Sequence, residues 1–201
     1  MNKKKFSTHY YALCILLFII SFYATLTISA DTYSFDWDHV NNGVVLMDSS
    51  DDYLTGNWGS AYNSGRSLWN SSSAPILILD TSFSYSNVDL FSIDETTWLN
   101  NGWGNVIAWS QLFDGNMVCN EHDENPDERC NSADYGAIYF NNGMYPGNLT
   151  TAAGTIAHEF GHIAGLAHPT ANVYSIMHQL WHPYRVQFIT QYDITELQNK
   201  Y

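Results

Sequence analysis

The segment HEFGHIAGLAH at residues 158–168 constrains this chain more than any other feature of its sequence. On an α-helix, residues four positions apart lie on one face, so His158 and His162 can point their ring nitrogens at one place. Zn²⁺ binds imidazole nitrogens at about 2.0–2.1 Å, and catalytic zinc sites have three protein ligands and an open position for water. Glu159 follows the first histidine, where a carboxylate can take a proton from such a water and later pass it on.

The third histidine of the segment requires a change of chain direction. His168 lies too far beyond His162 along a straight helix to reach the same metal ion. Gly165 lies between them and can adopt a positive φ without steric cost, which is how helices commonly end and turn back. Pro169 then prevents the helix from continuing. The spacing therefore predicts a metal site built from a helix and the turn that ends it.

The whole pattern, followed downstream by Ser175-Ile176-Met177, resembles the metzincin superfamily of zinc endopeptidases. An isolated His-Glu-x-x-His sequence occurs by chance in helices with buried histidines, but chance does not also supply the glycine, the third histidine and the methionine. The resemblance implies one catalytic Zn²⁺ and a hydrophobic floor that Met177 forms beneath the imidazoles without binding the metal. The implied metal ligands are His158, His162 and His168, and the implied catalytic general base is Glu159.

The resemblance also implies a fold. We expect an α+β, zincin-like (metzincin) fold with a mixed, mostly parallel twisted sheet, an antiparallel edge strand, a central active-site helix, a Met-turn and a C-terminal helix. In metzincins the strand before the active-site helix is the sheet edge, and an extended peptide substrate lies against it. That strand corresponds here to residues 137–140.

Within the superfamily, residues 31–201 most resemble the compact catalytic module of the matrixins and their bacterial relatives. Residues 190–201 are similar to the matrixin C-terminal helix, where the counterpart of Asp193 can pair with a new N-terminal ammonium. Pro169 is similar to the serralysins, but the sequence has no glycine-rich calcium-binding repeat. Gln179 stands where serralysins and astacins carry a zinc-facing tyrosine. A matrixin-like catalytic domain is therefore the better description.

Residues 1–30 have the pattern of a secretory signal peptide. Three lysines at positions 3–5 precede the apolar run 13–20, and Ile28-Ser29-Ala30 is an acceptable cleavage site. A retained N-terminal membrane anchor is the alternative. The hydrophobic content of 45% is sufficient for one domain over residues 31–201. We therefore expect a secreted, extracellular monomer without stable membrane association once the signal is cleaved.

The charge of the chain excludes one class of partner. All 20 acidic residues lie after position 30, whereas four of the seven basic residues do, so the segment after the signal carries a net charge of −16. Such a surface repels nucleic acid and anionic lipid headgroups. It also offers carboxylates for structural Ca²⁺ near Asp123, Asp127 or Asp134, although a solvated acidic loop is the simpler interpretation.

Two cysteines remain after the predicted signal. Cys119 and Cys130 enclose an acidic, polar loop, and an even pair in a secreted protein suggests a disulfide bond. Two free thiols or a pair of metal ligands are the alternatives. An oxidising extracellular setting favours the disulfide.

Hydrophobic patterns and turn residues predict the regular elements. Strands are expected at residues 44–47, 75–80, 104–110 and 137–140, and helices at about 53–69, over the metal-binding segment after a cap at Thr150 or Thr151, and at 190–201. Four further histidines could each be proposed as metal ligands, but we expect them to be solvated or hydrogen-bonded. They are His39, His122, His178 and His182.

The sequence thus predicts a secreted zinc metalloendopeptidase that hydrolyses proteins or peptides. A non-catalytic binding protein on the same scaffold is one alternative, and a zinc aminopeptidase or cell-wall amidase is another. A scaffold without activity usually loses its general base or a ligand, whereas all four of these side chains are present in residues 158–168.

Overall fold

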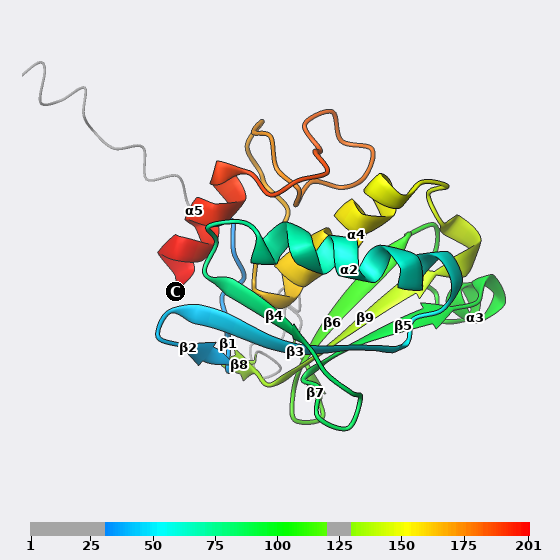
Figure 1. The fold of residues 1–201 in the computed structure, drawn as a ribbon, viewed down its shortest axis with the longest axis horizontal. Coiled ribbons are helices and arrows are strands. Elements are labelled where there is room, and N and C mark those ends of the chain that lie inside the picture. Colours follow the sequence, from blue (N-terminus) through cyan, green and yellow to red (C-terminus); the bar gives the residue numbers. More distant parts are fainter. Residues whose placement is uncertain (1–30, 120–129) are drawn as a thin grey trace, which may run out of the picture.

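The computed structural model describes residues 31–119 and 130–201 (Figure 1). The predicted signal peptide lies outside these residues, and so do His122, Asp123 and Asp127. The fold is α+β, with a seven-stranded mixed sheet and a separate two-stranded sheet formed by β1 and β8. The strands are β1 (Asp36–Trp37), β2 (Val40–Asn41), β3 (Val44–Tyr53), β4 (Ile76–Asp80), β5 (Val88–Ile93), β6 (Ala108–Asp114), β7 (Met117–Val118), β8 (Ser132–Ala133) and β9 (Tyr135–Asn141). The helices are α2 (Gly56–Asn70), α3 (Glu95–Asn100), the 3₁₀ turn η2 (Asn142–Met144), α4 (Leu149–Ile163) and α5 (Gln191–Lys200).

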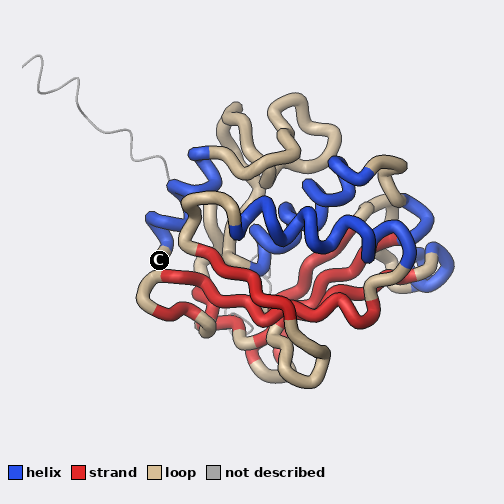
Figure 2. The backbone as a smooth tube through the Cα atoms, in the orientation of Figure 1, coloured by secondary structure: helices blue, strands red, loops and turns tan. Residues whose placement is uncertain are grey.

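The centre of the large sheet is parallel and one of its long strands is antiparallel. The order is β2-β3-β5-β9-β6-β7, and β4 also pairs with β3. Strands β3, β4, β5 and β9 run parallel, whereas β6 runs antiparallel to β9, from the pair Ala108↔Phe140 to the pair Phe113↔Tyr135. Helices α2 and α4 lie together on one face of the strands (Figure 2). The expected mixed sheet and C-terminal helix are therefore present.

One expectation about the sheet is wrong. The strand that precedes the metal-binding helix is β9, and it lies inside the sheet between β5 and β6 rather than at its edge. Ile138 and Phe140 are fully buried, and a strand so buried needs neighbours on both sides to satisfy its backbone groups. The antiparallel strand β6 occupies the outer position instead, and β7 pairs only with its last two residues.

Several element boundaries also differ from the expectations. Strand β3 continues to Tyr53, so helix α2 begins at Gly56 rather than at residue 53. Strand β6 begins at Ala108, because Gly104 has a positive φ of 59° and belongs to the preceding turn. The cap of α4 is Asn148, whose side chain accepts a hydrogen bond from the Thr151 backbone N–H at 2.8 Å, in place of a threonine cap.

Close packing of α2 against α4 places the histidine-bearing helix α4 over the sheet. A Cβ added at Gly65 of α2 would lie 2.6 Å from Cγ2 of Ile156 on α4, so the two helices approach to backbone distance at this point. Trp69 is fully buried, and its indole N–H donates to the Ala157 carbonyl at 2.7 Å. Every residue of α4 from Ala152 to Ile163 is buried. None of the helices in the described part of the chain is long and apolar enough to cross a membrane.

Candidate metal centre

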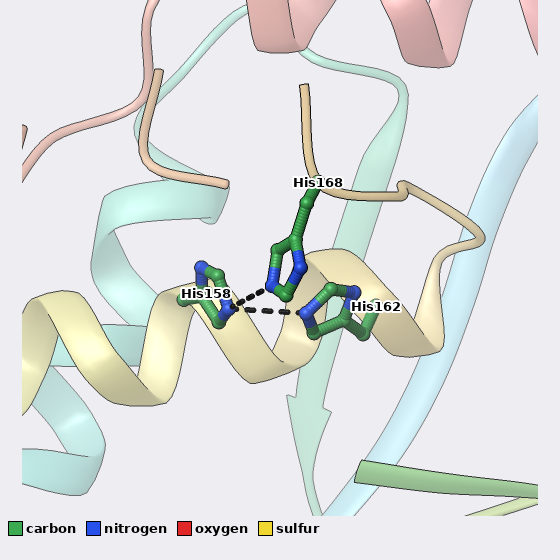
Figure 3. A group of neighbouring side chains, drawn as sticks. All are labelled: His158, His162 and His168. Atoms are coloured by element: carbon green, nitrogen blue, oxygen red, sulfur yellow. Dashed lines mark hydrogen bonds between the residues drawn. The ribbon is translucent and has the colours of Figure 1, made fainter. Parts of the chain in front are cut away.

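Helix α4 and the turn after it bring the three predicted ligands together (Figure 3). Nε2 of His158 lies 3.0 Å from Nε2 of His162 and 3.4 Å from Nε2 of His168. Within the described ranges, these three histidines are the one group of three or more candidate ligands that could hold a metal ion. The helical spacing therefore acts as predicted.

The chain reversal that delivers the third histidine occurs where expected. Helix α4 ends at Ile163, and Gly165 adopts a positive φ of 91°. The Leu166 N–H donates to the Gly161 carbonyl at 2.9 Å, which closes the end of the helix. A Cβ at Gly165 would also lie 2.6 Å from Cε of Lys200 on α5. The positive φ favours glycine here, and the Lys200 side chain would have to shift to admit a Cβ.

Backbone carbonyls orient the two helical imidazoles. Nδ1 of His158 lies 2.8 Å from the Ile176 carbonyl oxygen, and Nδ1 of His162 lies 2.8 Å from that of Leu166. A carbonyl can only accept, so each of these hydrogen bonds places the proton on Nδ1. The Arg185 guanidinium, which can only donate, lies 2.6 Å from Nδ1 of His158 and cannot bond to it in this tautomer. Each Nε2 lone pair is then free to bind a metal at the shared point.

Electrostatics keep both helical imidazoles neutral, as metal binding requires. Burial, together with the positive charge of Arg185, lowers the pKa of His158 well below its ordinary value. Burial also lowers the pKa of His162 to about 3. Both imidazoles are therefore neutral at neutral pH and keep a lone pair that a metal ion could use.

The spacing of the nitrogens fits a tetrahedral metal. Ligand nitrogens at 2.0–2.1 Å from a tetrahedral Zn²⁺ are about 3.3 Å apart. The separations of 3.0 and 3.4 Å in this cluster bracket that value. His168 is exposed to solvent while His158 is buried, so the cluster opens to solvent on one side. The three imidazoles thus fit a metal ion with an open coordination position.

Glu159 is the buried carboxylate beside this cluster, only 5% exposed. The Ser110 hydroxyl on β6 donates to Oε2 of Glu159 at 2.5 Å. Burial raises the pKa of Glu159 to about 7, while the hydrogen bond from Ser110 and the charge of Arg185 act in the opposite direction. Sequence reasoning did not identify Ser110. The sequence signal for Ser110 is its spacing: it lies two residues from each of the buried residues Ala108 and Leu112, so its side chain is on the same face of the strand as theirs.

The predicted methionine turn lies under α4. Met177 is buried, and its backbone N–H donates to Oγ of Ser175 at 2.9 Å. The Ser175 hydroxyl in turn donates to Asp193 of α5, whose other carboxylate oxygen accepts from the Ile176 N–H at 3.3 Å. Because Ile176 also accepts from His158, α5 is linked through this turn to a candidate metal ligand.

Arg185 is a second residue beside the site that sequence reasoning missed. Its guanidinium donates to the carbonyls of His178 and, at 3.1 Å, Gly154, and Nη1 lies 2.6 Å from Nδ1 of His158. Burial lowers the pKa of Arg185 to about 10, and the nearby charge of Glu159 acts against this shift. The guanidinium thus joins the chain after the methionine turn to helix α4.

The N-terminal segment of the described chain lies against the same region. The Tyr33 hydroxyl is 3.1 Å from Nδ1 of His162, and the Asp31 side chain accepts from both the N–H and the hydroxyl of Thr170. The Asp31 N–H donates to Oε2 of Glu196 at 2.8 Å. The acid of α5 that meets the start of this segment is therefore Glu196, whereas Asp193 binds the methionine turn.

The other candidate residues have different partners. Nε2 of His178 lies 2.8 Å from the Val173 carbonyl, His182 stacks on His178, and Nε2 of His39 lies 3.0 Å from the Asp134 carbonyl. The Asp134 carboxylate accepts from the Gly115 N–H at 3.1 Å. The disulfide bond between Cys119 and Cys130 is present as predicted.

Comparison with known proteins adds no assignment. No protein-family model matches this chain, and no curated protein matches it in sequence.

Proposed function

We propose that this protein is a secreted zinc metalloendopeptidase of the metzincin type, with a matrixin-like catalytic domain over residues 31–201. The observation that carries the proposal is the convergence of three imidazole Nε2 atoms beside a buried, hydrogen-bonded glutamate. A bound Zn²⁺ would supply Lewis-acid polarisation of the scissile carbonyl and lower the pKa of water. The Cys119–Cys130 disulfide is consistent with an extracellular location.

The side chains divide the work as follows. His158, His162 and His168 would hold the metal through Nε2, and backbone carbonyls orient the first two through their Nδ1–H groups. The Glu159 carboxylate takes a proton from the attacking water and returns it to the leaving amine. Met177 packs beneath the helix and has no role as a ligand.

Strand β6 supports cleavage within an extended chain. The carbonyl of Ile107 accepts from β9, and the carbonyl of Leu112 accepts from Cys119 on the other side. Because backbone groups alternate along an antiparallel strand, those of Ala108 and Ser110 point away from β9. Among the described residues, no strand pairs with this part of β6. An extended peptide can pair here without an anchored terminus, which favours an endopeptidase over an aminopeptidase.

Hydrolysis of a fluorescence-quenched protein substrate tests the proposal. The full chain, expressed for export, is compared with Glu159→Ala and His162→Ala, and bound zinc is determined for each. We expect cleavage by the wild type alone, with about one zinc in the wild type and in Glu159→Ala but none in His162→Ala. Zinc binding without cleavage of any peptide would instead indicate a binding protein or an amidase. Absence of zinc from the wild type would refute the metal site.

A further inference from the structure

Ser110 is a half-buried polar residue on β6. It lies on the strand face that packs under α4, between Ala108 and Leu112, which are both 5% exposed. An apolar side chain would suit such a position for packing alone. The hydroxyl instead contacts a single residue of α4: it lies 2.5 Å from Oε2 of Glu159 and 3.3 Å from its carbonyl oxygen.

This contact removes one degree of freedom from the glutamate. A carboxylate on a side chain with three rotatable bonds can swing away from a metal site, and Glu159 has no ion pair among the described side chains. A hydrogen bond to an ionised acceptor in a buried setting is among the stronger ones in proteins. With Oε2 held by Ser110, Oε1 is the oxygen left to face the histidine cluster.

Ser110 also belongs to the strand that a substrate would meet. Its backbone groups point to the open side of β6, away from β9, while its side chain points toward α4. One residue therefore joins the exposed backbone edge to the buried carboxylate. A peptide paired on this edge would be held at a defined distance from Glu159.

We propose that Ser110 is a positioning residue. Its hydroxyl holds the Glu159 carboxylate in a fixed position relative to both the metal site and the strand on which the substrate pairs. The inference rests on the proposed endopeptidase function. Ser110 acts through Glu159, so its loss lowers the rate of the chemical step and leaves metal binding and substrate affinity nearly unchanged.

The kinetic test uses the exported full chain loaded with zinc. In Ser110→Ala we expect kcat to fall by about 10- to 100-fold, the usual effect of removing an outer-sphere partner, with KM within about twofold. Ser110→Thr keeps the hydroxyl and restores most of the rate. In a Glu159→Ala background, Ser110→Ala should change the residual rate by less than about twofold, because there is no carboxylate left to position.

A matched control separates this role from simple strand packing. Ser92→Ala removes a hydroxyl from strand β5, which β9 separates from β6; Oγ of Ser92 accepts from the Thr55 N–H at 2.9 Å, and the substitution should leave kcat unchanged. A second readout needs no activity. In urea unfolding of the metal-free proteins, Ser110→Ala should lower the midpoint more in the wild-type background than in Glu159→Ala, where only the contact to the backbone carbonyl at 3.3 Å remains.

The outcomes distinguish this inference from the function on which it rests. Full kcat in Ser110→Ala beside an inactive Glu159→Ala would overturn the role of Ser110 and leave the endopeptidase intact. Equal loss of rate in Ser110→Ala and Ser110→Thr would also overturn it. So would an equal drop in the urea midpoint on Ser110→Ala in the wild-type and Glu159→Ala backgrounds. A wild type that binds zinc and cleaves no peptide would overturn both.

Discussion

Gly161 of helix α4 and Met177 of the turn beneath it are in direct contact. A Cβ built on Gly161 would lie 2.3 Å from Sδ of Met177 and 3.3 Å from Cζ2 of Trp69. The methionine side chain therefore packs against bare helix backbone, one residue before His162. This contact sets the height of the methionine turn below the metal-binding helix, and Ile176 in that turn accepts a hydrogen bond from His158.

Gly161→Ala is expected to destabilise the protein although alanine is the better helix former. Alanine gains about 1 kcal/mol in helix propensity, whereas overpacking a tight contact usually costs about 1–3 kcal/mol. The shifted turn should also weaken zinc binding through the Ile176–His158 hydrogen bond. Urea unfolding and a zinc competition titration measure the two effects. Adding Met177→Val should recover part of both losses, and a Gly161→Ala protein with wild-type stability would contradict the packing argument.

Removal of the metal should lower the melting temperature. A ligand that binds only the folded state stabilises it by about 4 kcal/mol at a thousandfold excess over Kd. Treatment with a chelator followed by addition of Zn²⁺ should lower and then restore Tm by differential scanning fluorimetry. His162→Asn is the matched control, because it lacks one ligand and should show little response. Identical melting curves with and without chelator in the wild type would exclude a stabilising metal.

The metal-free protein should lose stability as the pH falls below about 6.5. Burial lowers the pKa of His162 to about 3 and that of His158 well below its ordinary value, so below pH 6.5 the unfolded state binds more protons than the folded state. Proton uptake by the unfolded state favours unfolding, so the free energy of unfolding falls with pH. Glu159, whose pKa burial raises to about 7, opposes this trend.

Comparison with a variant isolates the histidine contribution to this pH dependence. His162→Gln cannot take up a proton in the unfolded state, but it retains the opposing carboxyl group. Urea unfolding at pH 7.5 and pH 5.5 should therefore give a larger loss of stability in the wild type than in the variant. Equal losses in the two proteins would show that His162 is not held neutral in the folded state.

The start of the described chain should be sensitive to signal processing. If cleavage follows Ala30, the Asp31 nitrogen that donates to Glu196 becomes an ammonium. Burial raises the pKa of Glu196, and a new positive charge beside it would lower that pKa and strengthen the contact. A chain that begins at Asp31 should then melt at a higher temperature than one with extra residues before it. Glu196→Gln should abolish the difference, and a difference that persists in this variant would assign it to another contact.

The metal ligands were predictable because their geometry is local. The rise and turn of one helix bring His158 and His162 to one face, and Gly165 with Pro169 forces the reversal that returns His168. Short apolar runs bounded by turn residues likewise placed β4 and β9 within a residue or two. In each case neighbours in the chain decide the conformation.

The strand order and the residues that hold the site in place were not predictable in this way. Ser110 is 49 residues from Glu159, and Asp193 is 18 residues from the serine that it holds. Nothing in the local pattern of β9 distinguishes an inner strand from an edge strand, because its apolar run suits either position. Pairing with β6 on the side opposite β5 makes β9 an inner strand.

The sequence by itself determined that three imidazoles and a carboxylate share one helix and its terminal turn, because helical periodicity and a glycine at positive φ are properties of a few consecutive residues. Only the tertiary structure decided what surrounds them. The hydroxyl of Ser110, the guanidinium of Arg185 and the open side of β6 come from separate elements. Their arrangement depends on how the sheet and helices pack, and contacts between distant segments leave no periodic signal in the chain.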